Sequence, residues 1–150
     1  MERGCAQLCA RNGDCAEDEI CIANTCGPHP GGETCDDAIQ YEIGTIVSGT
    51  TTIYLNDYDG GCVGDSAAEV VYGFEAAADG TVCATTRGSN FDTGLYARAG
   101  NCGGDSIACD DDDADFRIAE GTRSTIEFAV TQGTVYYLFV DGYSDNTGDY

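Results

Sequence analysis

Ten cysteines in a chain of 150 residues constrain the fold more than any other feature of this sequence. Cysteines at this density are typical of domains that fold outside a reducing cytosol and are crosslinked by disulfides. A structural zinc site usually has a Cys-x-x-Cys pair, and this sequence has none, so disulfides are the preferred interpretation. We expect disulfides at Cys5, Cys9, Cys15, Cys21, Cys26, Cys35, Cys62, Cys83, Cys102 and Cys109.

The spacing of the cysteines changes near residue 35, which predicts two regions. Residues 1–27 hold five cysteines in a polar stretch that is too poor in apolar residues for its own core, so crosslinks must stabilise it. Residues 28–34 are rich in Pro and Gly and predict a linker. Residues 35–150 form the main domain. Within the first region, the stretch from Cys15 to Cys26 is similar to small Cys-rich, growth-factor-like repeats of bacterial surface proteins.

Apolar and polar residues alternate in the main domain, which predicts strands. The alternation is clearest at residues 39–43 and 126–130, and residues 135–140 are apolar on both faces, as in the centre of a sheet. Further predicted strands cover residues 50–55, 69–75, 80–86, 93–98, 106–109 and 115–118. Eight or nine short strands without a convincing helix predict an all-β fold, an antiparallel jelly-roll-type β-sandwich with a small N-terminal disulfide-rich segment.

The disulfide pairing is one choice among many. Cys102 and Cys109 flank a short Gly-Gly-Asp turn and predict a local bridge. Cys35 with Cys62 would tie the first strand to an early loop. Cys83 then remains for the odd cysteine of the N-terminal region.

Four motifs occur in order along the main domain: VVYGFE, SNFDTGLY, ACDDDD and VYYLFVDGY, the last followed by GDY. Through these motifs residues 35–150 resemble the bacterial pre-peptidase C-terminal (PPC) domain. That family is a β-sandwich module appended to secreted proteases and to many surface proteins. The resemblance implies a β-sandwich and an extracellular setting.

Two departures from the family pattern bear on function. Asp110–Asp113 are four aspartates where the family usually reads Asn-Asp-Asp, which adds charge to an acidic loop. Family members also continue into a last strand where this chain stops at Tyr150. We therefore expect an unpaired sheet edge there, which is a template for another chain.

The charge balance excludes some functions. The chain has 27 acidic residues and six basic ones, a net charge of −21, and the six arginines are scattered, so nucleic-acid binding is not expected. No apolar stretch approaches the roughly 20 residues of a membrane span. The chain has no signal-peptide pattern at its start, so we expect a portion of a longer precursor that is secreted to the cell surface or beyond.

Clustered aspartates predict Ca²⁺ sites in the loops. Ca²⁺ takes six to eight oxygen ligands in flexible geometry, which suits loops dense in carboxylates. The sequence has no EF-hand, and a solvated acidic face or adaptation to high salt are the alternatives. Asp92 is expected instead to bond backbone amides of a turn. The candidate ligands are Asp57, Asp59, Asp110, Asp111, Asp112, Asp113, Asp141 and Asp145.

No catalytic constellation is evident, so the chain is not expected to be an enzyme. The single histidine, His29, lies between two prolines in the linker, and no serine has a Gly-x-Ser-x-Gly context. Carboxylate pairs abound, but the chain has no Trp, the usual platform for sugar stacking.

These observations predict a non-catalytic extracellular structural or adhesive module, a disulfide-crosslinked, Ca²⁺-binding β-sandwich. It would pack against copies of itself or against cell-surface protein or polysaccharide partners, as an appendage, filament or surface-layer subunit. The alternative is an accessory substrate-binding domain of a secreted protease or other hydrolase.

Overall fold

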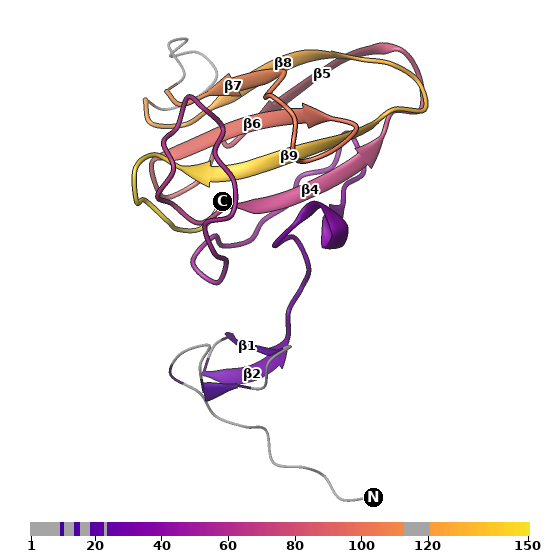
Figure 1. The fold of residues 1–150 in the computed structure, drawn as a ribbon. Coiled ribbons are helices and arrows are strands. Elements are labelled where there is room, and N and C mark those ends of the chain that lie inside the picture. The colour runs from indigo at the N-terminus through magenta and orange to yellow at the C-terminus, as the bar shows by residue number, and fades with distance from the viewer. Residues whose placement is uncertain (1–9, 11–13, 16–18, 23, 113–120) are drawn as a thin grey trace, which may run out of the picture. The chain divides into compact units, whose positions relative to one another are not determined.

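The computed structural model describes residue 10 and residues 14–15, 19–22, 24–112 and 121–150 (Figure 1). The chain divides into two compact units, residues 1–30 and residues 31–150, and each has its own strand pairing. Among the described residues, no helix is long and apolar enough to cross a membrane.

The first unit contains an antiparallel hairpin of β1 (Glu19–Ile22) and β2 (Thr25–Pro28). Asn24 lies in the turn with a φ of 63°, a left-handed conformation that asparagine adopts more readily than most residues. A disulfide joins Cys15 to Cys26, whose Cα atoms are 5.5 Å apart, and Cys21 is also disulfide-bonded. Crosslinks therefore stabilise this small unit, as the sequence predicts.

Residues 31–34 pack with the second unit, although the sequence predicts a linker that runs to residue 34. The Gly32 amide donates to the Asp37 carbonyl at 2.7 Å, and the Gly32 carbonyl accepts from the Val71 amide at 2.8 Å. Gly32 has a φ of 86°, and a Cβ there would lie 2.9 Å from a methyl group of Val70. Glycine thus lets the backbone lie directly against the sandwich, and the linker is shorter than expected.

A five-stranded sheet in the order β3-β4-β9-β6-β7 is the centre of the second unit. The apolar strand β9 lies in its middle, as its two apolar faces predict. β3 pairs with β4 in parallel, so the sheet is mixed and not wholly antiparallel as expected. The strands are β3 (Ile39–Gln40), β4 (Val70–Glu75), β6 (Thr93–Ala99), β7 (Ala108–Asp110) and β9 (Val135–Gly142).

A second, antiparallel sheet of β5 (Gly80–Thr85) and β8 (Thr125–Val130) lies on one face of the first (Figure 1). Its side chains Val82, Ile126 and Phe128 share a buried core with residues of β4, β6 and β9. Along β8, buried residues alternate with exposed ones, as the sequence predicts. The main domain is therefore an all-β fold of two packed sheets.

The opposite face of the five-stranded sheet carries a second buried cluster, formed by Val63, Val71, Tyr96 and Phe139. The rings of Tyr96 and Phe139 stack with centroids 4.6 Å apart. Val63 comes from the long irregular segment between β3 and β4, and it brings residues 56–65 onto this face. We name residues 56–65 the covering loop.

Two predicted strands differ in the structure. Residues 50–55 form no strand; Thr50 makes an isolated bridge to Asp149, and the Tyr54 amide donates to the Thr51 carbonyl in a turn. The prediction at 115–118 lies outside the described residues. The described part of the second unit therefore has the seven strands β3 to β9, fewer than expected.

The edges of the five-stranded sheet are β3 and β7, so the expectation of an unpaired edge at Tyr150 is wrong. Gly49 and Tyr150 exchange two backbone hydrogen bonds, of 3.1 and 3.0 Å. The hydroxyl of Tyr150 also lies 2.7 Å from that of Tyr72 on β4. Long-range pairing that the local pattern does not reveal therefore ties this segment to the domain.

The disulfides of the main domain pair differently from the expected scheme. Cys35 is joined to Cys102 and Cys62 to Cys109, with Cα atoms 5.9 and 6.1 Å apart, within the usual range. Cys109 pairs opposite Tyr96 across β6 and β7, which places it near the covering loop that carries Cys62. The bridges Cys35–Cys62 and Cys102–Cys109 are thus wrong.

Cys83 is free and exposed, so the predicted disulfide at this position is also wrong. It lies on β5 opposite Glu127 of β8, and both face away from the core that Val82 enters. The period of two along the strand therefore directs this thiol outward. Cys5 and Cys9 lie outside the described residues.

Candidate metal centre

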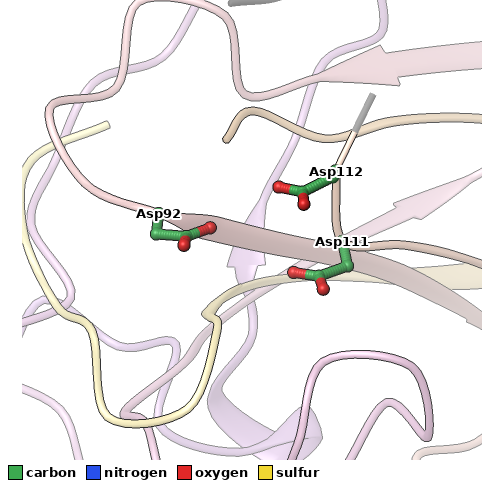
Figure 2. A group of neighbouring side chains, drawn as sticks. All are labelled: Asp92, Asp111 and Asp112. Atoms are coloured by element: carbon green, nitrogen blue, oxygen red, sulfur yellow. The ribbon is translucent and has the colours of Figure 1, made fainter. Parts of the chain in front are cut away.

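Three carboxylates meet where β6 begins and β7 ends. Asp92 directly precedes β6, and Asp111 and Asp112 directly follow β7. Because β6 and β7 pair antiparallel, with Leu95 opposite Asp110, these positions come to the same end of the sheet. One oxygen from each of the three carboxylates lies within 4.8 Å of the others, and Figure 2 shows the three groups facing a common space.

A buried hydroxyl network holds this corner in place. The Ser124 hydroxyl lies 2.7 Å from the carbonyl oxygens of both Thr93 and Asp111. The hydroxyls of Thr86 and Thr93 are 2.6 Å apart, and the Ser124 amide donates to Thr86 at 2.9 Å. These contacts link the two sheets and fix the backbone of Asp111.

The electrostatics of the group favour a bound cation. The pKa of Asp111 is raised to about 6, chiefly by burial and in part by the neighbouring charges of Asp112 and Asp92. Burial and Asp112 also raise the pKa of Asp92, whereas Arg123 lowers it. The Oδ1 atoms of Asp92 and Asp111 are buried and have no hydrogen-bond donor among the described residues. A hard divalent cation would satisfy both oxygens and neutralise the mutual repulsion.

Asp92 therefore differs from its expected place in a turn. Its buried Oδ1 accepts no hydrogen bond from a backbone amide in the described part of the chain. It faces Asp111 and Asp112 instead. In the sequence, Asp92 is an acidic residue directly before a predicted strand. Its proximity to the aspartate run follows only from the pairing of β6 with β7, which the sequence does not show.

Of the four consecutive aspartates, Asp111 and Asp112 join this site. The Asp110 carboxylate accepts the Thr125 amide at 2.8 Å, so it connects β7 to β8. Asp113 lies outside the described residues. The three described aspartates of this run therefore have different roles: Asp110 connects two strands, and Asp111 and Asp112 face Asp92.

The other predicted ligands lie apart from this group. Asp57 and Asp59 are exposed on the covering loop, where the Asp59 carboxylate accepts the Gly61 amide at 2.6 Å. Asp145 is exposed in the turn after β9. Asp141 is 2 % exposed and stands on β9, on the face that the covering loop shields.

Two charged residues that the sequence did not single out are buried. Glu69 is 0 % exposed and directly precedes β4, and Arg98 is 8 % exposed on β6. Arg98 donates to the carbonyl oxygens of Asp59 and Cys102. Both residues lie among apolar residues in the sequence, which marks them as unusual. Whether such a charged side chain is buried depends on the loop that covers it, and the local sequence does not show this.

The fold and the site together define a disulfide-crosslinked all-β domain with a candidate cation centre at one end of its sheet. No family model, curated protein or solved structure matches this chain.

Proposed function

We propose that this chain is a non-catalytic structural or adhesive module of the cell exterior, in which Ca²⁺ fixes one end of a disulfide-crosslinked β-sandwich. The observation that carries the proposal is the convergence of Asp92, Asp111 and Asp112, with two buried oxygens that have no partner in the described part of the chain. The disulfides support an oxidising compartment. The resemblance of residues 35–150 to the PPC domain supports the same setting.

Ca²⁺ is the cation that best fits this group. Its ligands are oxygens only, and it accepts exposed carboxylates such as Asp112 beside partly buried ones such as Asp111. Zn²⁺ prefers nitrogen and sulfur ligands, which this site lacks. Binding at Asp92 and Asp111 would join the loop before β6 to the loop after β7.

The site is tested by measuring Ca²⁺ binding and Tm on protein that has been freed of metal with EDTA and dialysed. Saturating Ca²⁺ at about 100 times its dissociation constant stabilises the fold by about 2.7 kcal/mol per site, or roughly 5–10 °C in Tm. Asp111→Asn/Asp112→Asn should bind one Ca²⁺ fewer per chain and show a smaller rise in Tm. The control Glu127→Gln/Asp145→Asn removes the same charge from exposed positions and should behave as wild type. Equal Ca²⁺ binding by both variants would refute the site.

Self-association is the proposed mode of action. Ile43, Ile46 and Val47 are 50, 97 and 41 % exposed, and they follow the edge strand β3. An exposed apolar run beside a sheet edge with free backbone groups favours pairing with a second copy. Sedimentation of the native protein at increasing concentration should show oligomers that Ile46→Ser weakens. A monomer over the whole concentration range contradicts this mode.

The alternative is an accessory substrate-binding domain of a secreted protease or other hydrolase, and one observation favours it for a polysaccharide substrate. A hollow of about 380 Å³ is lined by Tyr58, Tyr137, Asn101 and Asp36. Aromatic rings beside amide and carboxylate groups suit sugars. Titration with soluble polysaccharides, comparing wild type with Tyr137→Ala, separates this alternative from self-association.

A further inference from the structure

Two buried carboxylates stand opposite each other on the face that the covering loop shields. β4 and β9 pair antiparallel with Val70 opposite Val140, so Glu69 and Asp141 are the next opposed pair. They are 0 and 2 % exposed. Because side chains alternate along a strand, both lie on the same face as Val71 and Phe139. Like charges directly opposite each other on a sheet are destabilising.

The covering loop packs over this pair but provides hydrogen-bond donors for only part of its oxygens. One oxygen of Glu69, Oε1, accepts the amides of Asp57 and Tyr58, both at 2.8 Å. The other, Oε2, is buried and has no hydrogen-bond partner among the described residues. Asp141 accepts the Gly142 amide at 2.7 Å. A fully buried glutamate in this acidic corner therefore carries an oxygen that no described donor satisfies.

In the part of the chain that the structure describes, no cationic side chain compensates the charge of this pair. The pKa of Glu69 is raised to about 8, chiefly by burial; Asp141 and Asp57 contribute to the rise, and the hydrogen bonds from the Asp57 and Tyr58 amides oppose it. The pKa of Asp141 is raised to about 7, chiefly by burial and in part by Asp59, whereas the Gly142 amide and the Tyr96 hydroxyl lower it. Arg98 lies on the same face, but its guanidinium donates to backbone carbonyl oxygens.

From this arrangement we infer that Glu69 and Asp141 bind a second hard divalent cation of the Ca²⁺ class, between the five-stranded sheet and the covering loop. This interior site shares no residue with the site at Asp92, Asp111 and Asp112. An experiment can therefore disprove one of the two sites and leave the other standing. A divalent cation cancels the two buried charges, whereas two unpaired carboxylates in a low-dielectric interior are strongly unfavourable. The remaining oxygen ligands come from the covering loop, which also carries Asp57 and Asp59.

The interior cation has a structural consequence. Glu69 already holds the covering loop through the Asp57 and Tyr58 amides. A cation on its second oxygen links the same loop to β9 through Asp141. Without the cation, repulsion within the pair loosens the loop from the sheet.

Counting bound Ca²⁺ in variants of the intact chain tests the inference. Protein freed of metal by EDTA and dialysed into buffer at pH 8 is titrated with CaCl₂ by calorimetry, and its Tm is followed. We expect two Ca²⁺ per chain in wild type, one in Asp111→Asn/Asp112→Asn and one in Glu69→Gln/Asp141→Asn. The control Glu127→Gln/Asp145→Asn, which loses the same charge at exposed positions, should still bind two.

The outcomes separate this inference from the proposed loop site. Where wild type binds Ca²⁺, the interior site alone is refuted if Asp111→Asn/Asp112→Asn binds none or if Glu69→Gln/Asp141→Asn binds as many ions as wild type. A wild type that binds no Ca²⁺ refutes both sites. If metal-free Glu69→Gln/Asp141→Asn melts higher than wild type, and Ca²⁺ does not raise the Tm of Asp111→Asn/Asp112→Asn, protons and not a cation neutralise the pair.

A luminescence measurement on folded protein provides a second readout should the double variant not fold. The chain has no Trp, so Tb³⁺ emission excited in the aromatic band passes through tyrosine. Tyr96 is buried on β6, which pairs with β9, and its hydroxyl lowers the pKa of the Asp141 carboxyl. In Asp111→Asn/Asp112→Asn, Tb³⁺ emission should persist and should fall when Tyr96→Phe is added. Absence of sensitised emission in the parent variant contradicts the interior site.

Discussion

Arg98 shows how one residue holds together elements that are distant in sequence. Its guanidinium lies over the rings of Phe139, Tyr96 and Tyr58, at 5.1, 5.5 and 5.8 Å from their centroids. It also donates to carbonyl groups of the covering loop and of the β6–β7 turn. A planar group with several N–H donors is needed for stacking and forked donation together.

Replacement of Arg98 by lysine should therefore destabilise the domain although it keeps the charge. We expect Arg98→Lys to lower the free energy of unfolding by about 2 kcal/mol, because an ammonium cannot stack and reach both carbonyl oxygens. Urea unfolding followed by tyrosine fluorescence measures the change. The exposed Arg87 gives the matched control, and Arg87→Lys should lie within about 0.5 kcal/mol of wild type. Equal effects at the two positions would show that Arg98 contributes only charge.

At the scale of an element, the covering loop packs against the five-stranded sheet with its backbone very close to side chains of the sheet. A Cβ on Gly60 would overlap the ring of Tyr96, and a Cβ on Gly94 would overlap Val63. The loop can therefore seal the second apolar cluster only because both positions lack side chains. The same closure buries Glu69 and Asp141.

A methyl group at position 60 should lift the covering loop from the sheet. We expect Gly60→Ala to cost about 1–3 kcal/mol of stability, the usual cost of overpacking a close contact. Hydrogen exchange should show faster exchange of the Asp57 and Tyr58 amides, which donate to Glu69. Gly80→Ala is the control, since a Cβ there meets nothing within 4 Å. If both variants exchange like wild type, the loop does not depend on this contact.

At the scale of the whole molecule, disulfides connect segments that no strand pairing joins. Cys62–Cys109 ties the covering loop to β7, and Cys35–Cys102 ties the segment before β3 to the β6–β7 turn. Their sequence separations of 47 and 67 residues close long loops, which the chain-entropy account treats as strongly stabilising. A domain with many charged loops and a modest core gains rigidity from such links.

Removal of one disulfide should lower stability, whereas replacement of a free cysteine should not. We expect Cys62→Ser/Cys109→Ser to lower the free energy of unfolding by about 4 kcal/mol, as the entropy of closing a loop of 47 residues implies. Denaturant unfolding under non-reducing conditions measures it. Cys83→Ser should leave stability unchanged, because this thiol is free and exposed. A comparable loss in Cys83→Ser would mean that Cys83 is crosslinked in solution.

The sequence by itself determined the features that depend on neighbouring residues. Alternation at residues 126–130 and the apolar run at 135–140 predicted β8 and the central strand β9, because side chains of a strand alternate between two faces. The density of cysteines predicted disulfides. The aspartate run brought Asp111 and Asp112 into the set of candidate ligands.

Only the tertiary structure decided which distant residues meet. The partners of Cys35 and Cys62, the place of Asp92 beside Asp111, and the opposition of Glu69 to Asp141 all follow from strand register and loop closure. Those contacts join residues tens of positions apart, and shifting one strand by a single residue would turn its side chains to the other face. Local sequence patterns do not predict these contacts, because the contacts depend on how the two sheets and the covering loop pack together.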